Sequence, residues 1–257
     1  MLAKNLLVAA VVIFLYMTIV SIVARRLRRN DLADVAWGLG FVVVTLSTML
    51  YQGLFGVIQL TVAFMVTLWG VRLSSHIFGS WRKRAEEDYR YQAMRKSWKY
   101  SPTIQAYFQV FLLQGLLLFF VAMPIFVINS TKASFTGLIY AGLLVWIIGF
   151  ILEATADNQL RKFLAQTKNK GNIMDKGLWK YSRHPNYFGE VTQWWGIGFI
   201  ALTLPFGWLG LVGPITITFL IIKVSGIPLL EKRYAENLQY QAYAKKTSVF
   251  LPLPSKA

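Results

Sequence analysis

The sequence contains no cysteine, and this absence excludes several classes of site at once. Disulfide frameworks, thiolate nucleophiles, zinc ribbons and cysteine-ligated iron–sulfur centres all require that residue. Histidine is scarce as well, since only His76 and His184 occur, so we expect no metal site built from several histidines. Charged residues make up 15% of the chain, whereas a soluble globular domain carries about 25%. The shortage of charge argues for a lipid environment.

Apolar and aromatic residues are abundant instead. Of the 257 residues, 56% are hydrophobic, and 18 Phe, 12 Tyr and 9 Trp are among them. A spanning helix needs about 20 largely apolar residues. Seven stretches meet this requirement: 5–24, 33–51, 54–78, 103–128, 135–157, 185–204 and 207–226. The sequence therefore predicts an all-α, polytopic integral membrane protein, with residues 1–257 as one membrane domain of about seven transmembrane helices.

The net charge of +16 is distributed very unevenly between the loops. Four loop segments on one side hold 23 of the 27 Lys and Arg residues: 25–32, 79–102, 158–184 and 227–257. The opposite side holds only Lys4 and Lys132. Basic loops stay in the cytosol, so we predict an outside N-terminus and a cytosolic C-terminus. This topology and the attraction to anionic membrane lipids account for the charge, and no nucleic-acid partner is expected.

The densest polar cluster is GLWKYSRHPNYFGE, from Gly177 to Glu190. Pro185 suits the first turn of a helix, and the positive end of that helix would face the cytosol. Arg183 and His184 directly precede this start, where they can form a phosphate cradle with Lys180. The alternative is an interfacial loop whose aromatic residues anchor the helix while Arg183 contacts lipid phosphates.

Asn186 and Glu190 follow the cluster at a spacing of four, so they share one helical face. A carboxylate such as that of Glu190 is an acceptor suited to ribose hydroxyls. A similar stripe closes the span 135–157, because Glu153, Asp157 and Arg161 also recur every four residues. Asp157 and Arg161 can be a simple ion pair. Glu153 lies one turn deeper, where ionisable groups usually face a partner or a cavity.

Two further polar positions belong to the N-terminal half. Arg72 and His76 are four residues apart at the end of the span 54–78, either snorkelling to the interface or facing a site. Asp34 begins the span 33–51, either as a helix-flanking acid or as an acid that reaches a substrate cavity. The acids of the segment 86–91 predict specific pairing with a neighbouring arginine: Arg82, Arg84 or Arg90.

These motifs together resemble the C-terminal signature of the steroid 5-alpha-reductase superfamily, most closely its bacterial-type members. The resemblance rests on GLWKYSRHPNYFGE with the following Trp194 and Trp195, on E-x-x-x-D-x-Q-x-x-x-F from Glu153 to Phe163, and on W-G-x-R-L with EDYRY. The ending SGIPLLEKRY…FLP is similar too. The likeness runs from about residue 31 to 254 and is dense in the region 150–254, which would carry the cofactor site.

The resemblance implies a membrane oxidoreductase that uses NADPH to reduce a carbon–carbon double bond of a lipid-like substrate, steroid-, sterol- or isoprenoid-like. It implies a bacterial inner membrane rather than the endoplasmic reticulum. The positions that it assigns to the cofactor are Arg72, Arg84, Glu153, Asp157, Arg161, Tyr181, Arg183, His184, Asn186, Tyr187 and Glu190. Steroid reductases polarise their substrate with a Gln–Glu pair and a Tyr, but the first three spans here contain no Glu. Asp34 and His76 are therefore the candidates for the polarising or proton-donating catalytic group.

Two alternatives remain open at this point. Isoprenylcysteine and phospholipid methyltransferases share a similar R-H-P-x-Y segment but use S-adenosylmethionine. The longer string S-R-H-P-N-Y-F-G-E, with Asp157 upstream, favours the reductases. The other alternative is a non-enzymatic membrane scaffold or transporter, although a path through the bilayer is poorly supported because the polar residues gather near one face.

Overall fold

The computed structural model describes residues 1–132 and 137–255 as two compact units. Unit 1 comprises Met1–Phe135 with Leu204–Val212, and unit 2 comprises Thr136–Thr203 with Gly213–Ala257. The described residues form helices and no β-strand, which confirms the predicted all-α class. The first two residues of the predicted span 135–157 lie outside the described part of the chain. Of the region 150–254, all but residues 204–212 belongs to unit 2.

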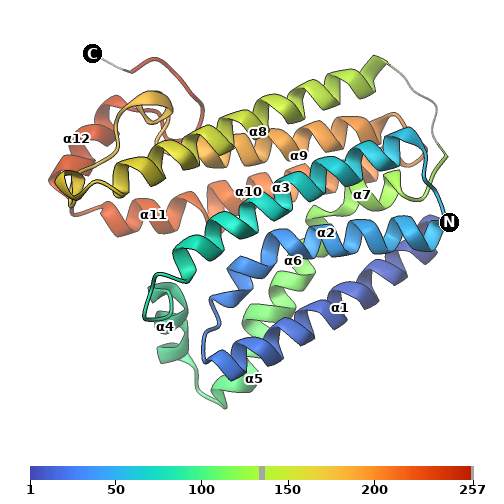
Figure 1. Cartoon of the computed structure of the whole chain (residues 1–257), viewed down its shortest axis with the longest axis horizontal. Helices are drawn as coiled ribbons and strands as arrows, with labels where there is room; N and C mark the ends of the chain where they lie inside the picture. Colours follow the sequence, from blue (N-terminus) through green and yellow to red (C-terminus); the bar gives the residue numbers. More distant parts are fainter. Residues whose placement is uncertain (133–136, 256–257) are drawn as a thin grey trace. The chain divides into compact units, whose positions relative to one another are not determined.

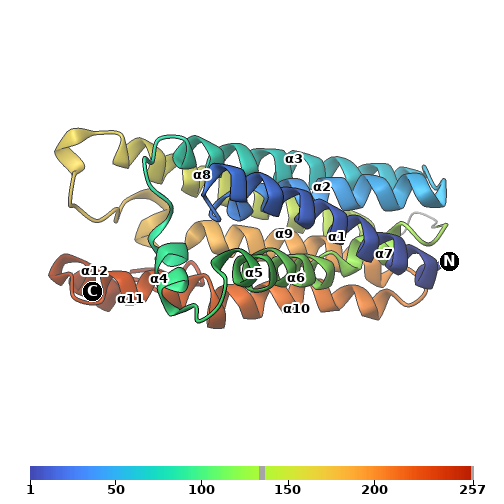
Figure 2. The same ribbon diagram turned by 90° about the horizontal axis from the view of Figure 1, so that it is seen from below.

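Unit 1 is built around three long apolar helices and a shorter interrupted segment. Its helices are α1 (Leu2–Leu27), α2 (Leu32–Gln52), α3 (Val57–Trp81), α4 (Tyr89–Ser97), α5 (Pro102–Ala106), the π-helix η1 (Tyr107–Leu112), α6 (Leu113–Val121), α7 (Met123–Ile128) and the 3-10 helix η4 (Gly207–Leu211). Helices α2 and α3 run side by side, as Figures 1 and 2 both show.

Buried amides tie α7 to its neighbours. Asn129, directly after α7, donates from Nδ2 to the carbonyl of Thr45 at 3.0 Å and to Oγ1 of Thr48 at 2.9 Å on α2. Asn5 of α1 donates to the carbonyl of Phe126 at 3.1 Å. Such bonds satisfy polar groups that would otherwise be buried without partners.

The predicted span 103–128 is not one continuous helix. It contains a π-helical stretch from Tyr107 to Leu112, and it breaks at Ala122 before the buried helix α7. Pro124 explains the break, because it has no N–H to donate and its ring fits only the first turn of a helix. The apolar part that remains long enough to span is Pro102–Val121.

Unit 2 contains a helical pair and a C-terminal cap. Its elements are α8 (Gly137–Leu164), the 3-10 helices η2 (Thr167–Asn169) and η3 (Gly177–Lys180), α9 (Pro185–Leu202), α10 (Val212–Phe219, whose first residue belongs to unit 1), the π-helix η5 (Leu220–Val224), α11 (Ile227–Tyr234) and α12 (Leu238–Lys246). Helices α8 and α9 lie side by side along most of their length (Figure 1).

The chain from residue 227 to residue 246 forms two helices, α11 and α12. Asn237 separates them, because its side-chain oxygen accepts from the N–H of Tyr240 at 3.0 Å and thereby starts α12. Helix α11 instead continues the apolar run that begins at Gly207.

Six helical segments of the described residues are long and apolar enough to cross a membrane. They are Leu2–Leu27, Leu32–Gln52, Val57–Trp81, Pro102–Val121, Gly137–Leu164 and Gly207–Tyr234. This finding confirms a polytopic membrane protein, with one candidate span fewer than the seven predicted. The missing one is α9, whose 18 residues include Asn186, Glu190 and Gln193 and are therefore less apolar.

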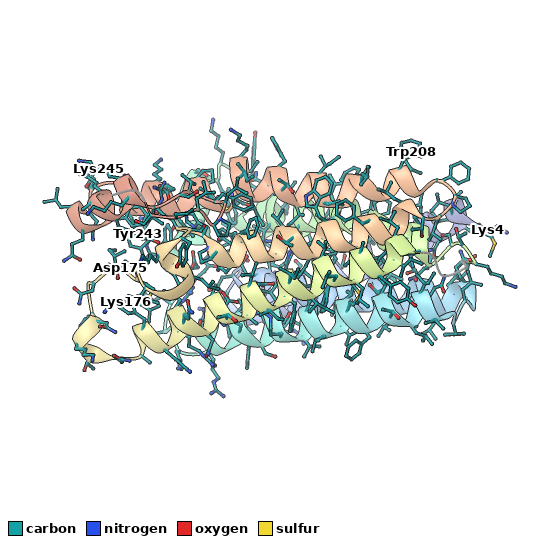
Figure 3. The ribbon with its side chains drawn as sticks, turned by 90° about the horizontal axis from the view of Figure 1, so that it is seen from above. Lys4, Asp175, Lys176, Trp208, Tyr243 and Lys245 are labelled. Atoms are coloured by element: carbon teal, nitrogen blue, oxygen red, sulfur yellow. The ribbon has the colours of Figure 1, made fainter. Side chains whose placement is uncertain are left out.

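Within each unit, the basic segments gather at one end. In unit 1 the guanidinium of Arg29 donates to the carbonyl of Arg84 at 2.9 Å, which joins segments 25–32 and 79–102. Lys4 lies at the other end with Trp208 (Figure 3). In unit 2 the segments 158–184 and 227–257 meet through the bond between Arg183 and Glu231. Lys176 and Lys245 lie at the end of unit 2 where these two segments meet (Figure 3).

Candidate functional site

The start of α9 faces the polar stripe of α8. Asn186 donates from Nδ2 to Oδ1 of Asp157 at 3.2 Å. Two turns further, Gln193 donates from Nε2 to Oε2 of Glu153 at 2.5 Å. Glu153 is only 2% exposed and Asp157 only 6%. The structure therefore brings two predicted site positions, 29 residues apart in the sequence, into direct contact.

Close packing of two glycines makes these contacts possible. A Cβ atom added to Gly189 of α9 would lie 2.5 Å from the backbone nitrogen of Glu153 and 2.7 Å from the carbonyl oxygen of Gly149. Backbone atoms cannot move aside individually, so the two helices approach this closely only where both residues lack side chains. Small residues serve the same purpose at other membrane helix contacts.

Gln193 carries an acceptor that the described residues leave unsatisfied. Its Oε1 atom is buried and has no hydrogen-bond partner among them, although the Nε2 atom of the same amide is bonded. A buried polar atom without a partner is unusual and needs an explanation. A ligand with an N–H or O–H donor would supply the missing bond.

Arg183 is bound by Glu231, a residue that the sequence reasoning missed. Its Nε and Nη2 atoms donate to the two carboxylate oxygens of Glu231 at 3.0 and 2.9 Å. Its Nη1 atom donates to the carbonyls of Ala244 at 2.7 Å and Thr247 at 3.1 Å. The guanidinium, expected to hold phosphate, thus holds α9 to α11 and to the end of α12.

His184, which caps α9, contacts the same carboxylate. Its Nε2 atom lies 2.9 Å from Oε1 of Glu231, and its ring stacks on that of Tyr187 with centroids 5.7 Å apart. Tyr240 donates to the same oxygen of Glu231 at 2.5 Å. Burial lowers the pKa of His184 even though the bond to Glu231 opposes this shift, and burial raises the pKa of Tyr240.

The C-terminal tail closes over the residues before α9. The backbone N–H of Arg183 donates to the carbonyl of Ser248 at 2.8 Å, and that of Leu253 donates to the carbonyl of Tyr181 at 3.0 Å. The hydroxyl of Ser182 donates to the carbonyl of Phe250 at 2.8 Å. Tyr181, a predicted cofactor position, is on the surface and is 43% exposed.

Two other cations near this cluster are open to solvent. Arg161 is exposed on α8 and donates from Nη2 to Oδ1 of Asn158 at 2.9 Å. Lys180 is exposed at the end of η3. Within residues 1–132 and 137–255, neither cation has a carboxylate partner of the kind that Arg183 has, so both can reach an anion without breaking an ion pair.

Asp34 lies in the first turn of α2 in unit 1. Its two carboxylate oxygens accept from Nη2 of Arg90 and from the hydroxyl of Tyr91, both at 2.6 Å. Gln114 donates to the same tyrosine oxygen at 3.2 Å. Burial raises the pKa of Tyr91, and the neighbouring Asp34 raises it further. The buried phenol of Tyr91 thus donates its proton in a short hydrogen bond to the carboxylate of Asp34.

The other predicted positions of unit 1 are Arg72, His76 and Arg84. Arg72 and His76 are half-buried on α3, one turn apart. Arg84 is exposed in the following loop and forms an ion pair with Asp88 at 2.8 Å. Asp88 also pairs with Arg90 at 2.9 Å, which confirms the expected pairing of the acidic segment 86–91 with its arginines.

Asp31 is a second acid that the sequence reasoning missed. It binds the guanidinium of Arg29 at 2.8 Å, the indole N–H of Trp81 at 2.9 Å and the backbone N–H of Asp88 at 3.0 Å. Burial favours the neutral form, but these hydrogen bonds outweigh burial and lower the pKa of Asp31. This carboxylate fastens the loop after α3 to the turn between α1 and α2.

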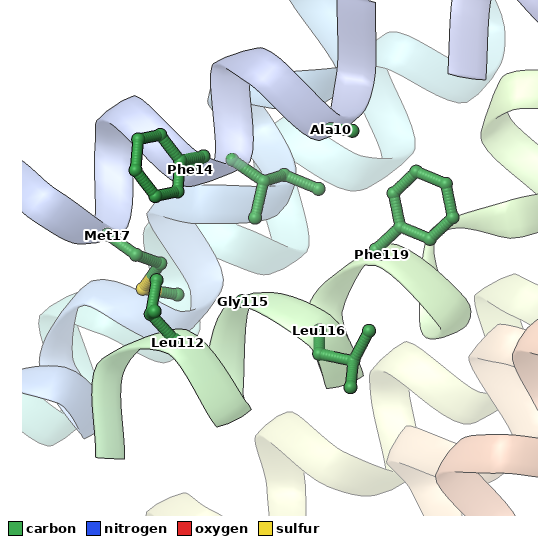
Figure 4. Close-up of a pocket in the computed structure, with 8 residues that line it drawn as sticks. Ala10, Phe14, Met17, Leu112, Gly115, Leu116 and Phe119 are labelled. Carbon is green, nitrogen blue, oxygen red and sulfur yellow. The ribbon is translucent and has the colours of Figure 1, made fainter. Parts of the chain in front are cut away.

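An apolar cavity of about 310 Å³ lies between α1 and α6 in unit 1 (Figure 4). Phe14 and Met17 of α1 face Leu116 and Phe119 of α6 across it, above Gly115. The residues that line it carry no polar side chain, so it suits an apolar group.

The polar residues of unit 2 fit a nicotinamide dinucleotide in their chemistry. The acceptors Asp157, Glu190 and the unsatisfied Oε1 of Gln193 suit ribose hydroxyls and a carboxamide N–H. The first N–H groups of α9, together with Arg161, suit a phosphate.

Comparison with known proteins gives a family without a described reaction. The family model described as "Protein of unknown function (DUF1295)" matches residues 20–247. An uncharacterised protein of Schizosaccharomyces pombe is 28% identical, and the alignment covers 74% of this chain and 62% of that protein. The chain thus spans less than two thirds of the length of this relative. No solved structure matches the chain.

Proposed function

The chain belongs to the DUF1295 family of proteins of unknown function, and we propose that it is a membrane oxidoreductase that uses NADPH to reduce a carbon–carbon double bond of a lipid. The substrate class is steroid-, sterol- or isoprenoid-like. One observation carries this proposal: α8 and the start of α9 place Asp157 against Asn186 and leave the acceptor of Gln193 unsatisfied nearby. The resemblance of these motifs to the steroid 5-alpha-reductase superfamily supports it.

Different residues of unit 2 would bind different parts of the cofactor. Asp157, Glu190 and Asn186 would bind the ribose hydroxyls, and Glu153 with Gln193 would meet the carboxamide. Arg161 would meet the phosphates beside the first N–H groups of α9. NADPH, when bound, supplies a hydride, and the chain's own contribution is to orient it, exclude water and provide a proton.

The source of the proton is a separate part of the proposal. Asp34 and His76 remain the candidate catalytic residues, with Arg72 and Arg84 as further phosphate contacts. Asp34 accepts a hydrogen bond from the buried hydroxyl of Tyr91, so a group that carries a proton lies directly beside this carboxylate. The apolar substrate would enter from the bilayer between helices, since the membrane is where such a lipid resides.

The membrane orientation is part of the same proposal. The basic ends of the units would face the cytosol, where NADPH is found, and the N-terminus would face outward. The bacterial inner membrane is the proposed location. The gathering of basic segments at one end of each unit supports the cytosolic orientation of that end. In unit 2 the polar cluster lies among these basic segments, which is where a cytosolic cofactor would bind.

Calorimetry on the protein in detergent micelles tests the cofactor directly. We expect NADPH to bind, and Asp157→Asn to weaken its binding about tenfold or more, because a hydrogen bond to a charged group contributes about 1.5–3 kcal/mol. Asp175→Asn is the matched control, since Asp175 is an exposed acid in the same basic segment. Binding of S-adenosylmethionine without binding of NADPH would refute the reductase proposal.

A second candidate is an S-adenosylmethionine-dependent methyltransferase. The commitment of Arg183 to Glu231 favours it, because fewer cations remain at the start of α9 than a phosphate cradle would use. S-adenosylmethionine carries no phosphate, and its ammonium and ribose groups suit carboxylate acceptors. The same calorimetric comparison separates the two cofactors.

A further inference from the structure

Glu231 collects hydrogen bonds from three side chains around the start of α9. It accepts two from Arg183, one from Tyr240 and one from the His184 ring. These groups come from α12 and from the segment before α9, whereas Glu231 itself lies on α11. A carboxylate with these neighbours cannot rotate without breaking several bonds at once.

The contact with His184 determines where its ring carries a proton. The Glu231 carboxylate has no hydrogen to donate, so the Nε2 atom of His184, 2.9 Å away, must be the donor. In a neutral imidazole the other nitrogen is then an acceptor. The stacked ring of Tyr187 and the backbone N–H of His184, which donates to the Ser182 hydroxyl at 3.1 Å, further restrict this side chain.

We propose that Glu231 is a positioning residue that holds His184 as the Nε2–H tautomer, so that Nδ1 is presented as a hydrogen-bond acceptor at the start of α9. The inference rests on the proposed function for the identity of the ligand. It assigns His184 to a donor group of the nucleotide, a hydroxyl or an amide N–H, rather than to a phosphate. Arg183 plays no direct part, since Glu231 already neutralises it.

The scarcity of histidine makes the tautomer directly measurable. The chain has only His76 and His184, so His76→Gln leaves a single imidazole. In protein labelled with ¹⁵N-histidine, two-bond ¹H–¹⁵N spectra above the pKa of the ring distinguish a protonated nitrogen from an acceptor nitrogen. We expect one species, protonated at Nε2. A ring protonated at Nδ1 would overturn the proposal.

Variants at Glu231 then test the cause. Glu231→Ala should populate both tautomers and raise the Kd for NADPH about tenfold, the loss expected for a charged hydrogen-bond partner. Glu231→Gln, which keeps the shape of the side chain, should also mix the tautomers, because its amide can donate as well as accept. It serves as the readout if the alanine variant does not fold. Glu236→Gln, an exposed acid beyond α11, is the matched control and should change neither quantity.

The outcomes separate this inference from the proposed function. A wild-type protein with the Nε2–H tautomer, lost in the Glu231 variants, but with no NADPH binding supports the positioning role and contradicts the reductase. NADPH binding together with an unchanged tautomer in both folded Glu231 variants overturns the positioning role alone.

Discussion

A side chain at Gly189 should force α8 and α9 apart. The first atom of that side chain, Cβ, would lie 2.5 Å from the backbone nitrogen of Glu153, about 0.9 Å short of the 3.4 Å at which ordinary contact begins. A second backbone atom, the carbonyl oxygen of Gly149, lies at 2.7 Å. Gly189→Val adds two further methyl groups at this crowded point, so the helices themselves must move.

The loss of stability in Gly189→Val depends on which atoms the new side chain would clash with, and here they are backbone atoms. Overpacking of a core costs about 1–3 kcal/mol, and the upper end applies here because backbone cannot rotate away. Val has a better helix propensity than Gly by only about 0.3 kcal/mol, so this gain offsets little of the cost. For a chain of this size, about 3 kcal/mol lowers the melting temperature by roughly 6–12 °C. The separation also stretches the bond between Asp157 and Asn186, so NADPH binding should weaken.

Thermal unfolding in detergent, followed by helical circular dichroism, measures the effect. The matched control is Gly137→Val on the same helix pair, because a Cβ at Gly137 meets nothing within 4 Å. We expect the control to melt within about 2 °C of the wild type, since surface substitutions usually change stability by no more than about 0.5 kcal/mol. Equal melting temperatures for the two variants would refute the argument that these helices are in backbone contact at Gly189.

Three further predictions concern unit 1 and the orientation in the membrane. Asp31→Asn should open the loop after α3 to trypsin at neutral pH, and Glu86→Gln should not. In the wild type the same loop should open in acid to pepsin, a protease that is active there. The contribution of a carboxylate with a lowered pKa is complete above its ordinary pKa and lost as the pH falls through the lowered one. A ratio of wild-type to Asp31→Asn cleavage that stays constant as the pH falls would contradict this. Asn129→Ala should lower the free energy of unfolding by about 1 kcal/mol, as polar contacts between membrane helices do, and an unchanged melting temperature would count against the amide ties. Since the chain has no cysteine, Lys132→Cys and Lys168→Cys can each be probed alone in intact cells with a membrane-impermeant maleimide. The first should react and the second should not, and the reverse pattern would invert the proposed topology.

The helical architecture was largely predictable from apolar run lengths, because about 20 apolar residues in a row have few other stable states. Pro185 starts α9 as predicted, since proline suits only a first turn. Pro124 carries the same signal inside the predicted span 103–128, but the prediction of one continuous helix there followed the length of the apolar run instead. The break at Ala122 shows that the proline signal was the correct one there.

The site was predictable only in part. A spacing of four along α8 predicted a common face for Glu153 and Asp157, but no local pattern gives the partner of either residue. Glu231 pairs with Arg183 across 48 residues, and such a pairing is decided by how helices pack rather than by nearby sequence. The sequence marks Glu231 in one way only, as an acid in a segment whose charged residues are mostly basic. Asp31 carries the same signal beside the run of arginines that ends at Arg29.

Transfer of hydride to a lipid is the central claim, and isotope labelling measures it. Protein reconstituted with bacterial membrane lipids would be supplied with NADPH that carries deuterium at C4 of the nicotinamide, and the lipids would then be analysed by mass spectrometry. The account predicts a lipid that gains one deuterium and one hydrogen, with loss of a double bond, and a smaller gain with the Asp157→Asn variant when NADPH is supplied near the Kd of the wild type. Methyl transfer from labelled S-adenosylmethionine, with no deuterium in any lipid, would contradict it.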